Sequence, residues 1–286
     1  MQYEAPGTVE EAISLLAKAN GDAKVLAGGT DLLVQLRSRL IRPGLIVNIK
    51  KIPEVGQITV EADGDFRIGA AVSGAEMGEH AELAAAWPGV VEATELIGST
   101  QIQGRATAVG NLCNASPAAD SVPALVAAGA EATIAGPNGT RQVPVQDIPT
   151  GPGQTSLANG EFVTGLVLPA KPANTGDAYL RMIPRTEMDI AIVGAGVCLT
   201  VDGDGTCTDA RVALGAVAPT VLLVQDAADA LIGSKLDDAA MAKLDAAAQA
   251  ACNPIDDKRG TIEYRTKVAG VLARRAAKIA LERAGS

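Results

Sequence analysis

Apolar and polar positions along the first fifty residues predict two helices and two strands. Apolar residues recur every three or four positions in TVEEAISLLAKA, residues 8–19, where Thr8 can cap a helix and Glu11 can complete a capping box. The runs AKVLA (23–27) and LIVNI (45–49) have the length and composition of buried strands, and DLLVQLRSRL between them places leucines four positions apart. The pattern therefore predicts a small β-α-β unit.

From residue 55 onward the pattern changes to short runs joined by turn residues. QITVEA and FRIGAA flank the turn sequence at 63–65, and EATIAG and RQVPV flank the one at 137–139, so each pair predicts a β-hairpin. Residues 99–121 hold too many Gly, Ser, Asn and Thr for a regular element and predict a long ordered loop. The other elements expected here are helices over 74–86 and 90–98 and a strand over 162–168.

A domain boundary is expected near LPAKPANTGD, residues 168–177, where two prolines and polar residues interrupt the pattern. Strands followed by helices, without strict alternation, then predict a second domain of the α+β class. The strands are expected over 178–183, 190–201 and 207–217, and the helices over 224–233, 237–252 and 261–284.

Composition excludes several classes of function. The net charge of -9 argues against nucleic-acid binding, which uses clustered Lys and Arg to displace counterions. Four scattered cysteines and the single His80 offer no recognisable ligand spacing for zinc or an iron-sulfur cluster. The chain shows neither a membrane-length apolar run nor the segments of a signal peptide, which predicts a cytoplasmic protein.

The stretch VLAGGTDLL, residues 25–33, is the first candidate binding site. Glycines at a turn from a strand into a helix allow a diphosphate to approach unpaired N–H groups, and the helix N-terminus adds positive potential. The same residues could instead serve only the turn, with Thr30 or Asp31 capping the helix. The G-x-G-x-x-G fingerprint is absent, so spacing leaves both interpretations open.

A second candidate is TAVGNLCNASPAAD, residues 107–120. It combines neutral hydrogen-bonding side chains with a glycine for close approach and with Asp120, whose carboxylate could bind a ribose hydroxyl pair. Each of these residues could also serve only in turns. Two such loops in one domain are compatible with a dinucleotide ligand.

Three motifs together resemble a known family. LAGGTDLLVQLRSRL with LIVNIKKIPE, then ATAVGNLCNASPAADSVPALVAAGAEATI, then YLRMIPRTEMDIAIVGAGV resemble the FAD-binding medium subunit of the molybdenum hydroxylases, the xanthine dehydrogenase and carbon monoxide dehydrogenase family. The motifs keep the family's order and spacing over essentially the whole chain.

The resemblance implies an α+β fold with two domains. Residues 1–174 would form a vanillyl-alcohol-oxidase-type FAD-binding domain, with subdomains of about 1–54 and 55–174. Residues 175–286 would form a C-terminal carbon monoxide dehydrogenase flavoprotein-like domain, a three-stranded antiparallel sheet packed with a helical bundle.

The resemblance also implies the FAD-binding residues. The diphosphate would be held by the backbone of the first loop, which is Leu26, Ala27, Gly28, Gly29, Thr30, Asp31 and Leu32. The second loop would contribute Thr107, Gly110, Asn111 and Asn114. Asp120 would face the adenosine end, Phe162 or Val163 would contact the adenine side, and Arg181 and Ile190 would lie near the flavin ring.

Some positions depart from the family's usual residues. Val109 stands where many relatives have the first glycine of a pair, and Arg181 stands where relatives often have Lys, which exchanges a compact ammonium for a planar fork. The family's carbon monoxide dehydrogenases typically have AGGHS and a Tyr beside the flavin, whereas this chain has AGGTD and Ile190. These two differences favour a xanthine dehydrogenase-like substrate, an N-heterocycle or an aldehyde, over carbon monoxide.

In the resembled family the organic substrate is oxidised on another chain. A large molybdopterin-binding subunit holds the molybdenum cofactor, a small subunit carries the 2Fe–2S clusters, and FAD on the medium subunit passes the electrons on to an acceptor. The resemblance therefore implies FAD as the only cofactor here, no metal and no catalytic side chain on this chain, and a dimer of heterotrimers. Two alternatives stay open: an FAD-free scaffold subunit, supported by Val109, and a free-standing flavin oxidase.

Overall fold

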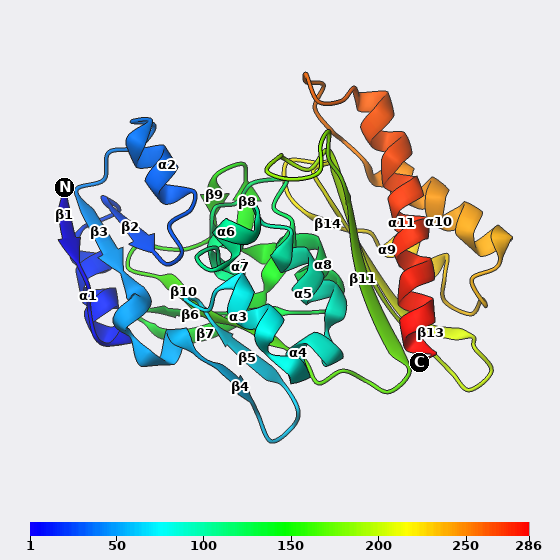
Figure 1. Ribbon diagram of the computed structural model, residues 1–286, viewed down its shortest axis with the longest axis horizontal. Coiled ribbons are helices and arrows are strands. Elements are labelled where there is room, and N and C mark those ends of the chain that lie inside the picture. The colour runs from blue at the N-terminus through cyan, green and yellow to red at the C-terminus, as the bar shows by residue number, and fades with distance from the viewer. Residues whose placement is uncertain (286) are drawn as a thin grey trace.

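The computed structural model describes residues 1–285, with the N-terminal sheet at one end of an elongated molecule and the C-terminal helices at the other (Figure 1). A parallel three-stranded sheet, in the order β1-β3-β2, forms the N-terminal end. Its elements are β1 (Gln2–Glu4), α1 (Val9–Lys18), β2 (Ala23–Leu26), α2 (Leu32–Arg37), β3 (Leu45–Asn48) and the 3-10 turns η1 (Ile49–Lys51) and η2 (Pro53–Gly56). The predicted β-α-β unit is confirmed, while β1 was not predicted because its three exposed residues carry no apolar pattern.

The start of α1 confirms half of the predicted capping box. The Thr8 hydroxyl accepts a hydrogen bond from the Glu11 N–H at 3.2 Å. The Glu11 carboxylate accepts instead from the Gly7 N–H at 2.8 Å, so the prediction of a box with Thr8 was wrong. A complete box between Ser73 and Glu76 begins α3 (Gly74–Glu79).

A five-stranded antiparallel sheet, in the order β4-β5-β10-β6-β7, forms the middle of the molecule. Its strands are β4 (Ile58–Val60), β5 (Phe66–Gly69), β6 (Glu131–Gly136), β7 (Gly139–Pro144) and β10 (Phe162–Leu168). Both predicted hairpins are present. The 3-10 turn η3 (Val145–Asp147) and a small pair of strands, β8 (Pro149–Gly151) and β9 (Gln154–Thr155), lie between β7 and β10.

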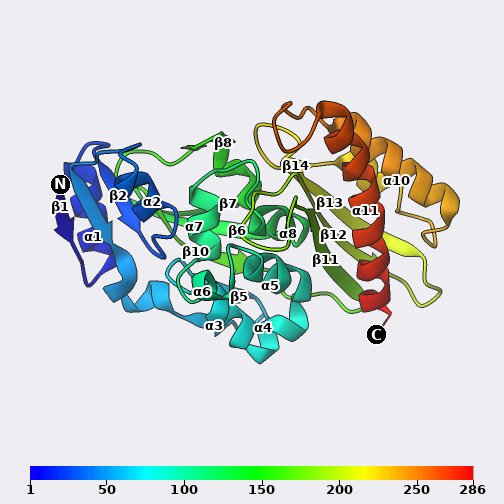
Figure 2. The same ribbon diagram turned by 45° about the horizontal axis from the view of Figure 1, so that its top comes forward.

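Helices cover this middle sheet (Figure 2). The helix predicted over 74–86 is divided at His80, whose ring Nδ1 accepts the Leu83 N–H at 3.2 Å and so caps a new helix. The helices of this region are α3, α4 (Ala81–Ala86), α5 (Pro88–Glu95), α6 (Thr100–Gln103), α7 (Ala108–Cys113) and α8 (Ser121–Ala127).

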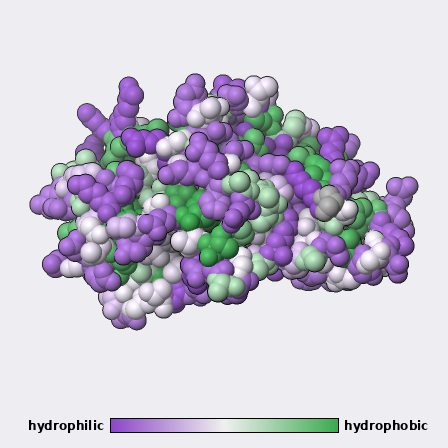
Figure 3. Space-filling model, turned by 60° about the horizontal axis from the view of Figure 1, so that its bottom comes forward, coloured by the Kyte–Doolittle hydropathy of each residue, from purple (hydrophilic) through white to green (hydrophobic). Residues whose placement is uncertain are grey.

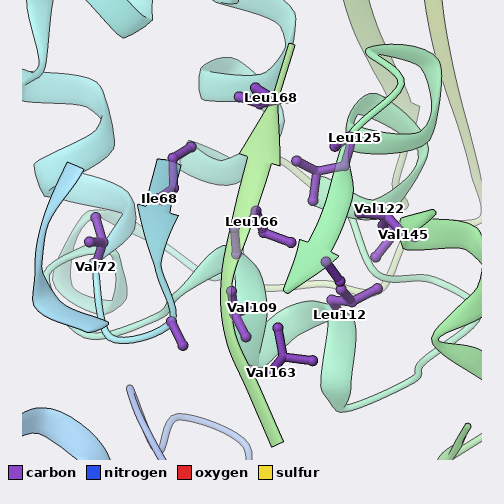
Figure 4. Packing of buried hydrophobic residues seen from close by; sticks show 14 of the residues in the cluster. Ile68, Val72, Val109, Leu112, Val122, Leu125, Val145, Val163, Leu166 and Leu168 are labelled. Atoms are coloured by element: carbon purple, nitrogen blue, oxygen red, sulfur yellow. The ribbon is translucent and has the colours of Figure 1, made fainter. Parts of the chain in front are cut away.

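The prediction that 99–121 lacks regular structure was wrong. Thr107 caps α7 by accepting the Gly110 N–H at 2.8 Å, and Val109 and Leu112, three positions apart, bury the same face. Figure 4 shows these two side chains packed beside Leu166 of β10, within the cluster that also contains Leu125 of α8. Short helices of this kind are capped by polar residues that, in sequence, also suit loops.

The C-terminal half contains a four-stranded antiparallel sheet in the order β11-β12-β13-β14. Its strands are β11 (Thr175–Met182), β12 (Val193–Val201), β13 (Cys207–Gly215) and β14 (Leu222–Leu223). The fourth strand corrects the expected number of three. A two-residue strand is too short to leave a periodic pattern in the sequence.

Helices α9 (Gln225–Asp229), α10 (Asp238–Ala251) and α11 (Ile262–Ala284) follow the sheet. Helix α11 crosses one face of the sheet so closely that a Cβ on Gly176 would lie 1.9 Å from the Ala280 carbonyl oxygen. Helix α8 of the middle region packs on the other face, where a Cβ on Gly196 would lie 2.5 Å from the Pro123 carbonyl oxygen. The last sheet is thus covered by a helix from each half (Figure 2).

Hydrophobic residues divide into two buried clusters, one under the first two sheets and one between the last sheet and α9 to α11. On the face in Figure 3, the largest hydrophobic area lies near the middle of the molecule, among hydrophilic residues. Among the described residues no helix is long and apolar enough to cross a membrane.

Candidate functional site

A cavity of about 650 Å³ lies between the N-terminal unit and the middle region. Both candidate loops line it. From the predicted set the lining includes Ala27, Gly28, Gly29, Thr30, Asp31, Leu32, Thr107, Gly110, Asn111, Asn114, Phe162 and Val163. The fold therefore brings together two loops that are some eighty residues apart in the sequence.

The two glycines of the first loop are required for different structural reasons. A Cβ on Gly28 would lie 2.0 Å from the Arg105 carbonyl oxygen, so this glycine lets the first loop press against the backbone that leads into the second. Gly29 has φ +78°, a conformation that costs a glycine little. Gly28 thus allows the first loop to contact the backbone of Arg105 and Ala106, directly before the second loop.

The first loop leaves its backbone donors free. Within residues 1–285, the N–H groups of Gly28, Gly29, Thr30 and Asp31 donate no hydrogen bond to another group of the chain. Asp31 holds the N-cap position of α2, as one interpretation expected, but its side chain makes no capping hydrogen bond. A row of unpaired N–H groups at the rim of a cavity can receive an anionic ligand.

Cationic and carboxylate groups lie beside the first loop. The Lys50 ammonium donates to the Ala27 carbonyl oxygen at 2.6 Å, and burial, with a smaller contribution from the Arg105 charge, lowers the Lys50 pKa. Desolvation raises the pKa of the Asp31 carboxyl group. Both residues are nonetheless exposed at the surface, so water still reaches this part of the site and screens its charges.

The second loop presents amide side chains to the cavity. The Asn111 oxygen accepts the N–H of Ser121 at 3.2 Å and its hydroxyl at 2.8 Å. The Asn114 oxygen accepts from the Gln35 side chain at 3.1 Å, which joins α7 to α2 of the N-terminal unit. This last hydrogen bond links the two sides of the cavity.

Five polar residues that sequence reasoning missed also line the cavity: Lys24, Gln35, Thr155, Asn159 and Glu161. Gln35 lies one helical turn after Asp31, so helical spacing from the first loop was a usable signal. Thr155 and Asn159 approach from the segment between β8 and β10, and no pattern in the sequence marks them.

Four predicted residues lie outside the cavity lining: Leu26, Asp120, Arg181 and Ile190. Leu26 ends β2 and lies between Val25 and Ala27, which both line the cavity. Ile190 is 51% exposed, in the segment between β11 and β12. The predicted contacts of these four with a cofactor remain predictions that the cavity does not support.

Asp120 and Arg181 form a buried ion pair between the two halves of the molecule. Their atoms approach to 2.7 Å, the Tyr179 hydroxyl donates to the second Asp120 oxygen at 3.0 Å, and Arg181 also donates to the Leu96 carbonyl oxygen. Burial raises the pKa of Asp120 to about 6, against the opposing effects of Arg181 and Tyr179. Both carboxylate oxygens are therefore engaged within the chain, behind the cavity wall.

Cysteine chemistry and metal binding find no support among the described residues. No group of three or more His, Cys, Asp and Glu in residues 1–285 could hold a metal ion. Cys113 reaches the cavity, but burial raises the pKa of its thiol to about 12, which keeps it protonated.

The cavity suits a dinucleotide cofactor. Its volume lies within the range of about 300 to 1,000 Å³ that is usual for cofactor sites. Free N–H donors at Gly28 to Asp31, with the Lys50 and Arg105 charges nearby, match a diphosphate, and the polar second loop matches further hydrogen-bonding groups. The fold and the cavity thus define a cofactor-binding protein with a second α+β domain.

Comparisons with known proteins give the family. Residues 1–171 match the FAD binding domain in molybdopterin dehydrogenase, and residues 178–280 match the CO dehydrogenase flavoprotein C-terminal domain. The chain belongs to the family of FAD-binding medium subunits of the molybdenum hydroxylases, which confirms the resemblance, the fold class and FAD as the cofactor. The molybdenum and iron-sulfur cofactors of this family are carried by other chains.

The relatives include carbon monoxide and xanthine dehydrogenases. The chain is 36% identical to the carbon monoxide dehydrogenase medium chain of Afipia carboxidovorans, over 99% of this chain and 97% of the relative. It is 35% identical to the xanthine dehydrogenase FAD-binding subunit of Escherichia coli O157:H7, over 79% and 77%. A solved carbon monoxide dehydrogenase from Oligotropha carboxidovorans superimposes with a TM-score of 0.94 at 35% identity, over 99% of this chain and 98% of that one. These similarities do not determine the substrate class.

Proposed function

We propose that the cavity between the two loops is the FAD site of an electron-transfer subunit. The chain would take electrons from the 2Fe–2S clusters of a small partner chain and pass them to an external acceptor, while a large molybdopterin-binding partner oxidises the substrate. The observation that carries this proposal is the meeting of both loops at one cavity, where the Gly28–Asp31 N–H groups are unpaired and Asn111 and Asn114 also line the wall.

The residues of the lining suggest how each part of FAD would be held. The N–H groups of the first loop would bind the diphosphate, since they are free donors beside Lys50. Thr107 would act by capping α7 and shaping the second loop, and Phe162 would supply an apolar wall. Bound FAD would supply the redox chemistry; the chain would orient it, limit its contact with water and leave a path for electrons.

The assembled enzyme would contain large, medium and small subunits, as a dimer of heterotrimers. For its substrate we propose an N-heterocycle or an aldehyde in preference to carbon monoxide. Thr30, in the AGGTD sequence, supports this preference and lines the cavity. Ile190, the other residue behind it, lies outside the lining, so the preference rests on the first loop alone.

A ligand comparison tests the cofactor proposal. The purified full chain, freed of any flavin, is titrated with FAD and with riboflavin, which lacks the diphosphate, and flavin fluorescence and visible absorbance are followed. We expect one FAD per chain and a much weaker affinity for riboflavin. A chain that assembles with its partners without taking up FAD would support the scaffold alternative.

The electron-transfer role is tested in the assembled complex. Complexes containing the FAD-loaded and the flavin-free chain are mixed anaerobically with carbon monoxide, an N-heterocycle or an aldehyde, and cluster and flavin absorbance are recorded. We expect cluster reduction in both complexes and acceptor reduction only with the FAD-loaded chain, and the reducing compound identifies the substrate class. Turnover by the isolated chain would instead support a flavin oxidase.

The scaffold alternative depends on Val109. Val109 is 5% exposed and packs in the core beside Leu112 (Figure 4), and it lines the cavity together with Gly110. A valine at this position is therefore compatible with a cavity open to FAD.

A further inference from the structure

We propose that Ser121 is a positioning residue of the FAD site, which turns the Asn111 side chain so that its amide NH2 group donates into the cavity. The proposal rests on the proposed function, because it concerns a side chain of the same cavity. Ser121 itself is completely buried and does not line the cavity.

The orientation of the Asn111 amide follows from its partners. Oxygen and nitrogen of an asparagine amide look alike in shape, and only hydrogen bonding distinguishes them. The Ser121 backbone N–H can only donate, and it lies 3.2 Å from the amide atom that faces it, so that atom is the oxygen. The Ser121 hydroxyl donates to the same oxygen at 2.8 Å and reinforces the choice.

The NH2 group of Asn111 is left for another acceptor. Within residues 1–285 no group of the chain accepts a hydrogen bond from it, and Asn111 is half-buried in the cavity lining. A ligand with acceptor oxygens or ring nitrogens, as FAD has, satisfies that donor. Asn111 thus adds a donor to those of the first loop.

The residue before Ser121 is held in place by side chains of the C-terminal half. Ser121 follows Asp120, whose carboxylate is held by Arg181 and Tyr179 of β11. The carboxylate therefore supports the segment from which Ser121 bonds Asn111. Through Ser121, Asp120 would support the site without lining it.

The experiment measures FAD affinity of the full chain for Ser121→Ala, Asn111→Ala and the double variant. We expect Ser121→Ala to weaken FAD binding about threefold to tenfold, the usual value of one hydrogen bond. It should also change the visible circular dichroism of the bound flavin. Ser121→Thr, which keeps the hydroxyl, should restore affinity to within about twofold, and Ser116→Ala, a hydroxyl loss in the same segment that touches only the Ala118 N–H, should leave it unchanged.

The double variant separates positioning from a merely structural role. If Ser121 acts through Asn111, Ser121→Ala causes no further loss of affinity in the Asn111→Ala background. An equal loss in both backgrounds, or wild-type affinity and spectrum in folded Ser121→Ala, overturns the inference. Failure of the wild-type chain to bind FAD overturns the proposed function instead, and thermal unfolding of each variant identifies any that fail to fold.

Discussion

The cavity and the interface between the two halves use polar residues in opposite ways. At the cavity, the N–H groups of Gly28 to Asp31 and the NH2 group of Asn111 have no partner within the described chain. At the interface, Asp120 directly precedes α8. One of its carboxylate oxygens accepts a hydrogen bond from Tyr179 and the other accepts one from Arg181. Buried polar groups whose hydrogen bonds are all made within the chain hold the two halves in one arrangement, whereas unpaired donors around a cavity can bind a ligand.

The comparison teaches that position along a motif does not decide a residue's role. Asn111 and Asp120 belong to one stretch of sequence, and the resemblance implies cofactor contact for both. Helices α7 and α8 place one on the cavity and the other behind it. The direction of a side chain separates binding from support.

The largest effect is expected from Gly28→Ala. The added Cβ would meet the Arg105 carbonyl oxygen at 2.0 Å, a backbone atom that cannot rotate away, so the two loops must separate. We expect a loss of about 3 kcal/mol in the free energy of unfolding and no measurable FAD binding. Gly104→Ala is the matched control, since a Cβ there meets nothing within 4 Å. Wild-type FAD affinity in Gly28→Ala would show that FAD binding does not depend on the close approach of Gly28 to Arg105.

Arg181→Met should destabilise the fold more than it affects the cavity. It removes one partner of a buried ion pair, which costs about 3 kcal/mol because the Asp120 carboxylate remains buried. Denaturant unfolding and FAD titration of the folded variant measure the two effects. Arg67→Met, which breaks an exposed ion pair with Glu61, should lower the free energy of unfolding by less than about 1 kcal/mol. A similar loss for both variants would show that burial of the Asp120–Arg181 pair does not raise its contribution to stability.

The interface should also respond to pH in a defined direction. The Asp120 pKa is raised to about 6 in the folded chain, so the folded state binds a proton more readily than the unfolded state. The stability due to this carboxyl group is present below its unfolded pKa and is lost as pH rises through about 6. The difference in unfolding free energy between wild type and Asp120→Asn should be about 1 kcal/mol larger at pH 5 than at pH 8. A difference that is independent of pH, or that grows with pH, would show that the pKa is not raised.

The smallest effect is expected from Gln35→Leu. It breaks the hydrogen bond to Asn114 that joins the two sides of the cavity, and FAD should then dissociate about threefold faster, with little change in stability. Stopped-flow exchange of bound FAD against a competing flavin measures the rate. Gln142→Leu, at an exposed position of β7, serves as the control and should leave the rate unchanged.

The sequence by itself determined most of the elements and both loops of the cavity. The β-α-β unit, two hairpins and the long C-terminal helices could be predicted because apolar periodicity reports which face of an element is buried. The glycines at 28 and 29 and the polar stretch after 106 marked both loops, because such residues are needed where a backbone comes close to another group.

Only the tertiary structure decided which polar residues face the cavity. It paired Asp120 with Arg181, joined Gln35 to Asn114 and placed Ser121 behind Asn111, contacts that span 61, 79 and 10 positions of sequence. It also divided 99–121 into short helices and added β14, neither of which has a periodic pattern long enough to read. The physical reason is that periodicity records burial along one element, whereas hydrogen-bond partners are chosen between elements after they pack.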